Sequence, residues 1–160
     1  MKTKFIYVFL IMLCFSLMSF SCSNDDDDIM TNDNSTEINE IKNTIQANSW
    51  TITSFVDSGA DETNHYTGYS FTFNSDGTLT ASNGSKTYNG TWSITDDSNS
   101  NDDSISSDDI DFNIYFASPA MFNDDLTEDW ELVTHSATKI QLIHISGGNG
   151  GTDTITFEKN

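Results

Sequence analysis

The feature of this sequence that most constrains its fold is the alternation of large apolar and polar residues that begins at Ser49. A period of two places every second side chain on the same face, so it predicts strands with one buried face. We expect eight strands, at residues 49–56, 66–74, 78–82, 86–95, 110–117, 129–135, 138–145 and 153–158. Short strands separated by turn signals indicate an antiparallel barrel or sandwich.

The hairpin loops between these strands provide an independent test of the alternation. Residues that pair across a hairpin share a face, so the parity of the two apolar series decides whether a loop is odd or even. Ser75–Gly77 and Ser136–Thr138 satisfy this rule as three-residue loops. Asn83–Gly84 satisfies it as a two-residue loop, which would pair Leu79 with Tyr88. Their agreement favours an up-and-down order of strands.

The predicted strands direct one set of large side chains to the inside. A domain of this size buries roughly two-thirds of its surface, so most of this set should form the core. Eight strands make the smallest barrel that either fills itself with side chains or holds one small ligand. The inward set comprises Trp50, Ile52, Tyr69, Phe71, Phe73, Leu79, Tyr88, Trp92, Ile94, Ile110, Phe112, Ile114, Phe116, Trp130, Leu132, Ile140 and Leu142.

A short helix is expected before the first strand, over residues 36–46. Ile38, Ile41 and Ile45 recur at spacings of three and four, which gives one apolar stripe. A helix this short needs a larger surface to lie against. Asn34, followed three places later by Glu37, predicts a capping box at its start.

The N-terminal residues have the organisation of a targeting segment. Basic residues 1–4 precede the apolar run 5–18, which is shorter than the ~20 residues that span a bilayer. The segment Ser19–Cys22 then resembles the lipobox of bacterial lipoproteins. The resemblance implies cleavage before Cys22 and attachment of a diacylglycerol, with acyl chains such as palmitate, to its thiol. We therefore expect a signal peptide at 1–21 and a protein held at a membrane by lipid.

The residues after Cys22 resemble the acidic export signal of Bacteroidota surface lipoproteins. That resemblance implies a lipid-anchored protein on the outer face of the outer membrane, whereas a solvated acidic linker is the alternative. We assign residues 22–35 to an acidic tether and residues 36–160 to the barrel domain. The residues of the predicted export signal are Ser23, Asn24, Asp25, Asp26, Asp27 and Asp28.

Several segments of the body resemble bacterial lipocalin-like domains. They are the helix followed by Ser49-Trp50, the segment Gly68–Phe73 with its Asp76-Gly77 turn, Gly90–Trp92 and Thr156–Glu158. The resemblance covers roughly residues 45–160 and implies an eight-stranded antiparallel up-and-down barrel around a ligand calyx. The residues expected to contact a small apolar ligand there are Trp50, Phe71, Trp92, Trp130 and His144.

Two functions of different classes follow from this fold. The first is binding of a small apolar ligand inside the barrel, which the resemblance implies. The second is a surface interaction or accessory protein with a filled barrel, acting through its loops and acidic face. The number of large inward side chains favours a filled barrel, while the resemblance favours ligand binding.

Charge excludes several other functions. The chain carries 25 acidic residues against 6 lysines and no arginine, a formal net charge of -19. It therefore lacks the basic footprint of nucleic-acid binding. Both cysteines lie within the first 22 residues, so the body holds no thiolate metal site. We expect a monomer without nucleic acid or cofactor.

The acidic segment between the fourth and fifth predicted strands is a candidate calcium loop. Asp97, Asn99, Asn101 and Asp108 fall at positions one, three, five and twelve of such a loop. Position six is Asp102 rather than glycine, and position twelve is not glutamate. We therefore expect a solvated loop, with calcium binding as the alternative.

No residues have the pattern of a catalytic centre. The body has no free thiol and no Gly-x-Ser-x-Gly elbow. The acidic pairs Asp124-Asp125 and Glu128-Asp129 are adjacent in sequence, so their side chains should point apart, at a turn or helix near residues 120–128. His144 should face Trp130 inside the barrel, and the other histidines lie on different hairpins. We predict a protein that is not an enzyme.

Overall fold

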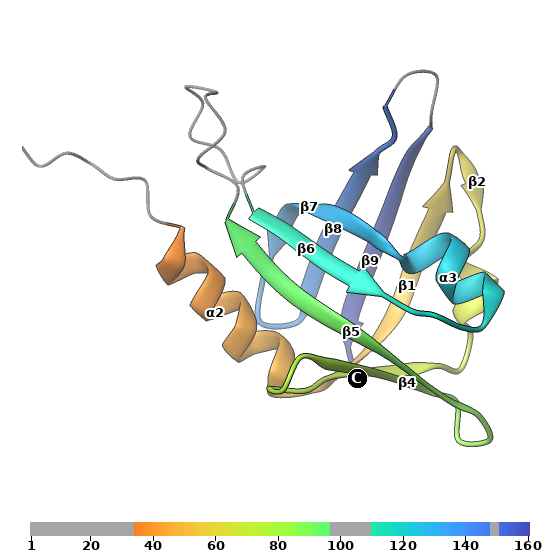
Figure 1. Ribbon diagram of the computed structural model, residues 1–160, viewed down its shortest axis with the longest axis horizontal. Helices are drawn as coiled ribbons and strands as arrows, with labels where there is room; N and C mark the ends of the chain where they lie inside the picture. The colour runs from red at the N-terminus through yellow and green to blue at the C-terminus, as the bar shows by residue number, and fades with distance from the viewer. Residues whose placement is uncertain (1–33, 97–109, 148–150) are drawn as a thin grey trace, which may run out of the picture. The chain divides into compact units, whose positions relative to one another are not determined.

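The computed structural model describes residues 34–96, 110–147 and 151–160. These residues form one antiparallel sheet of nine strands, closed into a barrel because β1 also pairs with β9 (Figure 1). Strand β2 (Ala60–Asp61) only extends β1 as a hairpin, so the remaining eight form the barrel wall. They are β1 (Ser49–Asp57), β3 (Ser70–Phe73), β4 (Thr78–Ser82), β5 (Thr87–Asp96), β6 (Ile110–Tyr115), β7 (Glu128–His135), β8 (Lys139–Ile145) and β9 (Thr152–Lys159).

The strands follow one another around the wall in sequence order, which confirms the predicted eight-stranded up-and-down barrel. This topology is consistent with the lipocalin-like fold class. The β3–β4 loop has the three predicted residues, since Phe73 pairs with Leu79 and the Asn74 N–H donates to the Thr78 carbonyl at 2.8 Å. Gly77 has the positive φ of 83° that this turn requires.

The predicted pairing of Leu79 with Tyr88 is wrong by two residues. Tyr88 pairs with Ala81, and the loop spans four residues, 83–86, rather than two. The side chain of Asn83 explains the longer loop, because its Oδ1 accepts the backbone N–H groups of Ser85 and Lys86, at 3.2 and 2.9 Å. The loop remains even, so the alternation of faces is preserved.

The β7–β8 hairpin has a four-residue loop, 136–139, rather than the three predicted residues, and a bulge in β7 restores the predicted register beyond it. Leu132 pairs with Leu142 as expected, whereas His135 pairs with Ile140, so the register shifts at Val133. The extra residue lies on the outer face, where the side chain of Val133 is 52% exposed. A bulge of this kind increases the local twist of a strand without moving its buried residues to the other face.

The predicted strand 66–74 starts too early. Residues 63–66 form a 3-10 helix, η1 (Thr63–Tyr66), and β3 begins only at Ser70. Thr63 secures the start of η1, because its N–H donates to Asp61 Oδ1 at 3.1 Å and its hydroxyl accepts the Phe55 N–H at 2.8 Å. These local side-chain bonds compete with strand formation.

Helices cover both ends of the barrel (Figure 1). The predicted N-terminal helix is α2 (Ser35–Gln46), which buries its isoleucine stripe and accepts the indole N–H of Trp50 at the Ile45 carbonyl, 2.8 Å away. At the other end, η1 packs beside α3 (Ala120–Leu126). The predicted capping box is wrong: Asn34 makes no cap bond and instead donates to Asp96 Oδ1 at 3.2 Å.

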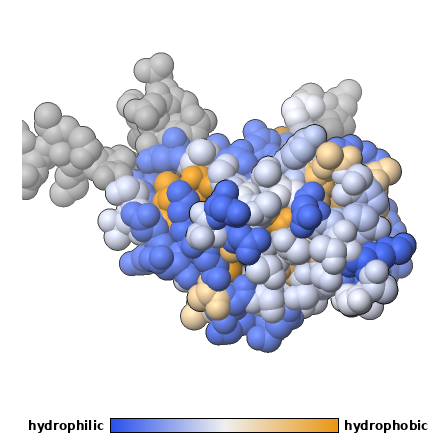
Figure 2. All heavy atoms as spheres, turned by 60° about the horizontal axis from the view of Figure 1, so that its bottom comes forward, coloured by the Kyte–Doolittle hydropathy of each residue, from blue (hydrophilic) through white to orange (hydrophobic). Residues whose placement is uncertain are grey.

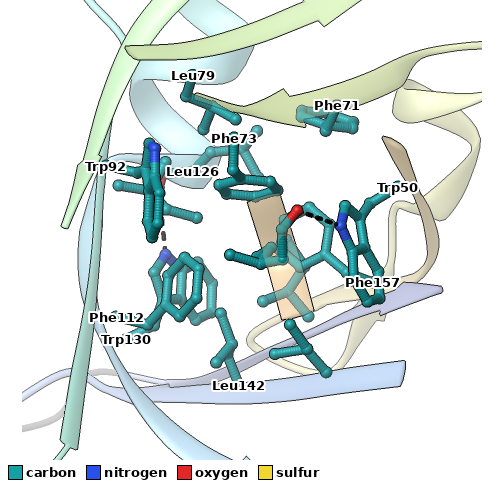
Figure 3. Packing of buried hydrophobic residues seen from close by; sticks show 14 of the residues in the cluster. Trp50, Phe71, Phe73, Leu79, Trp92, Phe112, Leu126, Trp130, Leu142 and Phe157 are labelled. Atoms are coloured by element: carbon teal, nitrogen blue, oxygen red, sulfur yellow. Dashed lines mark hydrogen bonds between the residues drawn. The ribbon is translucent and has the colours of Figure 1, made fainter. Parts of the chain in front are cut away.

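The core is a continuous cluster of aromatic and aliphatic side chains (Figure 3). All of the predicted inward residues are buried except Tyr69 and Tyr88, which are partly buried against the cluster. The predicted inward set leaves out part of the core. Ala81 alternates with Leu79, and Ile155 alternates with Phe157 in β9, whereas Phe55 follows the bulge in β1. Tyr66, Phe122 and Leu126 lie on helices rather than strands.

Candidate functional site

Four of the five residues expected to bind an apolar ligand lie in the packed core. Trp50, Phe71 and Trp130 have no exposed surface, and Trp92 is 6% exposed. Trp92 stacks on Phe112 with ring centroids 5.9 Å apart, and the rings of Phe71 and Trp130 also have close aromatic neighbours (Figure 3). The indole N–H groups of the three tryptophans donate to backbone carbonyls, at 2.8 to 3.2 Å. The contacts and hydrogen bonds of these four side chains are therefore made within the protein itself.

The fifth residue, His144, lies at the rim rather than deep in the barrel. It contacts Trp130 as predicted, with ring centroids 6.1 Å apart. Its Nε2 lies 3.6 Å from Glu128 Oε2, and its Nδ1 lies 3.7 Å from Asp129 Oδ1. The imidazole thus lies between two carboxylates, one facing each ring nitrogen.

A hollow of about 660 Å³ lies on the outer wall, along β5, β6 and the start of β7. Most of its lining residues are polar, among them the outward-facing Thr91, Ser93 and Asn113, while the buried Trp92 and Ile114 also contribute. Asn113 is held in place by donating to Thr95 Oγ1 at 3.0 Å, and the ring of Tyr115 is 52% exposed. The hollow therefore presents polar groups beside one exposed aromatic ring, that of Tyr115.

The hollow is acidic. Asp76, Glu128 and Asp129 line it, and among its lining residues there is no lysine or histidine. Hydrogen bonds from the hydroxyl and N–H of Thr78 lower the pKa of Asp76 below its ordinary value, so this carboxylate is charged at neutral pH. The site is thus suited to cationic groups rather than to anions.

A second group of titratable side chains lies where η1 meets α3. His65 Nδ1 is 3.4 Å from Glu62 Oε2 and 3.7 Å from Asp125 Oδ2. The hydroxyl of Tyr66 donates to the same Asp125 oxygen at 2.9 Å. Burial, followed by this bond, raises the pKa of Tyr66 far above its ordinary value, so the hydroxyl remains a donor.

The sequence pattern does not predict this group. The spacing of three between Glu62 and His65 is a signal for it, but it lies just before the predicted strand 66–74, in the segment where the structure has η1. Asp124 and Asp125 were expected to point apart, and only Asp125 is directed toward η1. Glu128 and Asp129 flank the imidazole of His144. They meet it only because β7, which carries both acidic residues, pairs with β8.

The remaining predicted sites lie outside the described residues. They are the lipidation site Cys22, the export signal 23–28 and the calcium candidates Asp97, Asn99, Asn101 and Asp108. The predicted signal peptide 1–21 lies there too, as does most of the tether 22–35. Within the described ranges, none of the helices has the length and apolar character needed to cross a bilayer.

Comparison with known proteins gives one structural similarity. No protein-family model matches the chain, and no curated protein matches it significantly. The chain is similar to the crystal structure of a DUF4847 family protein from Bacteroides vulgatus, at 17% sequence identity and a TM-score of 0.46. The similarity covers 75% of this chain and 97% of that one.

Proposed function

We propose that this chain is a lipid-anchored, non-catalytic lipoprotein of the outer-membrane surface that binds a basic partner protein through its acidic outer wall. One observation carries this choice over ligand binding inside the barrel. The inward side chains pack against one another, while α2 covers one end of the barrel and η1 with α3 cover the other. When its own side chains fill the interior of a barrel, the outer surface is what remains available for binding.

The composition of the outer surface favours a charged partner. Figure 2 shows a face that is mainly hydrophilic, on which hydrophobic residues form small separate spots. Among the described residues, the large hydrophobic side chains that are exposed are Tyr115, Val133 and Ile145, and only Tyr115 lines the hollow. Single exposed apolar residues are normal, whereas a docking surface for an apolar partner needs a contiguous patch. Acidic groups around one exposed tyrosine fit a lysine- or arginine-bearing surface.

The localisation rests on the N-terminal resemblance. Cleavage before Cys22 would remove two of the six lysines and leave all 25 acidic residues on the mature chain. We expect a monomer with this high negative charge to remain well solvated on its lipid anchor and to repel other acidic surfaces. Binding of a small apolar ligand, which the lipocalin-like resemblance implies, is the competing proposal.

Capture on intact cells tests the proposal. The full chain would be cross-linked on the surface of its native host, and partners retained after purification would be identified. The double variant Glu128→Gln/Asp129→Asn should lower the recovery of the partner about tenfold or more, since close interfacial charge pairs contribute about 1.5–7 kcal/mol. The matched double variant Glu40→Gln/Glu158→Gln removes the same charge from exposed positions elsewhere and should leave recovery unchanged.

Native mass spectrometry of the same purified chain distinguishes the competing proposal. A chain at its processed, lipidated mass with no further adduct supports the solid scaffold. A discrete apolar adduct that is lost on denaturation would overturn the proposal in favour of a calyx. Equal recovery of the partner with both double variants would show that the acidic wall is not the binding surface.

A further inference from the structure

Glu62, His65 and Asp125 converge on one point at the end of the barrel. The same nitrogen of His65, Nδ1, faces both carboxylates, at 3.4 Å from Glu62 Oε2 and 3.7 Å from Asp125 Oδ2. One ligand atom from each of the three residues lies within 4.8 Å of the others. Three potential ligand atoms thus surround a common position.

The local fold explains this convergence. Residues three apart in a 3-10 helix are eclipsed, so Glu62 and His65, at the start and within η1, point to the same side. Asp125 comes from α3, and its position is set by the hydroxyl of Tyr66, which donates to it at 2.9 Å. Tyr66 has no exposed surface and packs on Phe122 with ring centroids 5.7 Å apart. The carboxylate of Asp125 is therefore fixed in position by a hydrogen bond from a buried side chain.

The separations match those of ligands around one metal ion. Zinc binds histidine nitrogen at about 2.0–2.1 Å and carboxylate oxygen at about 2.0–2.2 Å, so ligand atoms in a tetrahedral site lie roughly 3.4 Å apart. The two measured separations, 3.4 and 3.7 Å, are close to this value. Three protein ligands leave the fourth tetrahedral position open to water or another donor.

A second cluster of the same composition has a different geometry. In the cluster of Glu128, Asp129 and His144, the carboxylates face opposite ring nitrogens, at 3.6 Å from Nε2 and 3.7 Å from Nδ1. One ligand atom from each of these residues also lies within 4.8 Å of the others, but an ion bound to one ring nitrogen would have only one of the two carboxylates facing that nitrogen. Asp129 is also 71% exposed, against 15% for Asp125. This cluster provides an internal control.

We propose that Glu62, His65 and Asp125 form a binding site for a divalent transition-metal ion, zinc being the expected ion, that joins η1 to α3. An imidazole with two carboxylates suits zinc, whereas calcium and magnesium prefer sites made of oxygen alone. Among the described residues, the ion-pair partner recorded for both carboxylates is His65, and lysine is not among their partners. A bound cation would neutralise two acidic groups of a chain whose net charge is -19.

Calorimetric titration of zinc into the full chain tests the proposal. The chain would carry a tag without histidine, be purified in detergent and be freed of metal with a chelator. Wild type and His144→Ala should bind one zinc ion with equal affinity. His65→Ala and Asp125→Asn should each weaken binding at least about tenfold, since even the outer partners of metal ligands contribute that much. Saturating zinc should raise the melting temperature of wild type and His144→Ala by several degrees and leave His65→Ala unchanged.

Cobalt provides a spectroscopic test of the same site. Co²⁺ in a four-coordinate protein site absorbs visible light far more strongly than the hydrated ion, so wild type should develop this absorption and His65→Ala should not. The amide of Asp125→Asn can still accept the Tyr66 hydroxyl, which keeps α3 in place while removing the charge. Zinc affinity that is the same in wild type and in both site variants would overturn the proposal, as would the absence of binding at millimolar zinc.

Discussion

At the scale of single residues, the main feature of the protein is a core of aromatic rings that pack against one another. Phe112 has no exposed surface, stacks on Trp92 and meets Phe73 edge to face at 5.7 Å. The indole N–H of Trp92 donates to the Asn74 carbonyl at 3.0 Å. Rings packed in this way contribute both buried area and favourable geometry.

The substitution Phe112→Ala should therefore lower the free energy of unfolding by about 3–5 kcal/mol, through lost burial and the cavity that remains. Urea unfolding followed by tryptophan fluorescence measures this. Tyr115→Ala, on the same strand but 52% exposed, should change stability by about 0.5 kcal/mol or less. A small effect of Phe112→Ala would mean that the interior has room to rearrange, as a ligand calyx would.

A second residue-scale prediction concerns pH. The pKa of Asp76 is lowered from 3.8 by hydrogen bonds from the hydroxyl and N–H of Thr78. The charged form therefore favours the folded state, and its contribution is present above pH 3.8 and is lost as pH falls through the lower folded pKa. Wild type should exceed Asp76→Asn in stability at neutral pH, and the difference should shrink below about pH 4. Unfolding midpoints measured between pH 2 and 7 on both chains would contradict this if the difference were constant.

At the scale of elements, the barrel depends on close approach between neighbouring strands. Gly90 in β5 lies against the end of β6, and an added methyl group there would overlap the Tyr115 carbonyl oxygen and the ring of Phe116. The neighbouring backbone is fixed, because the Phe116 N–H donates to Thr127 Oγ1 at 2.9 Å. A glycine in a strand at such a point reflects packing rather than a turn.

The substitution Gly90→Ala should therefore destabilise the protein by about 1–3 kcal/mol or more, as overpacking does. Thermal unfolding followed by circular dichroism measures the shift. The adjacent variant Asn89→Ala, on the exposed face of β5, should stay close to wild type. Equal stability of both variants would show that β5 and β6 can separate without cost.

At the scale of the whole molecule, net charge and the N-terminal segment are the dominant features. The acidic residues outnumber the lysines by about four to one over the chain, and the described lysines form a single recorded ion pair, Lys139 with Glu158 at 4.0 Å. Exposed ion pairs of this kind contribute little to stability. The net charge is therefore expected to affect the solubility of the protein and its choice of partners rather than its fold.

The lipid anchor is tested by Cys22→Ala. The variant should no longer incorporate labelled palmitate and should leave the membrane fraction, because one or two acyl chains supply the whole of the membrane affinity expected here. Membrane fractionation after metabolic labelling measures both effects. A variant that still sediments with the membrane would mean that another segment holds it there.

The acidic run has a separate test. Replacing Asp25–Asp28 with asparagine should leave the protein lipidated and bound to membrane, but protected from protease added to intact cells. Wild type should be digested under the same conditions. Digestion of both chains would show that the acidic run is only a spacer.

The alternation of residues was sufficient to predict the eight-stranded up-and-down barrel and most of its core, because a period of two leaves a strand one way to bury its large side chains. The N-terminal helix followed from the separate spacing of its isoleucines by three and four. The apolar pattern did not determine the exact register. The side chains of Asn83 and Ser136 accept backbone N–H groups in two turns that are longer than predicted, and β7 has a bulge at Val133. The group of Glu62, His65 and Asp125 depended entirely on tertiary structure. Its residues lie up to about 60 positions apart and meet only because the buried Tyr66 joins η1 to α3.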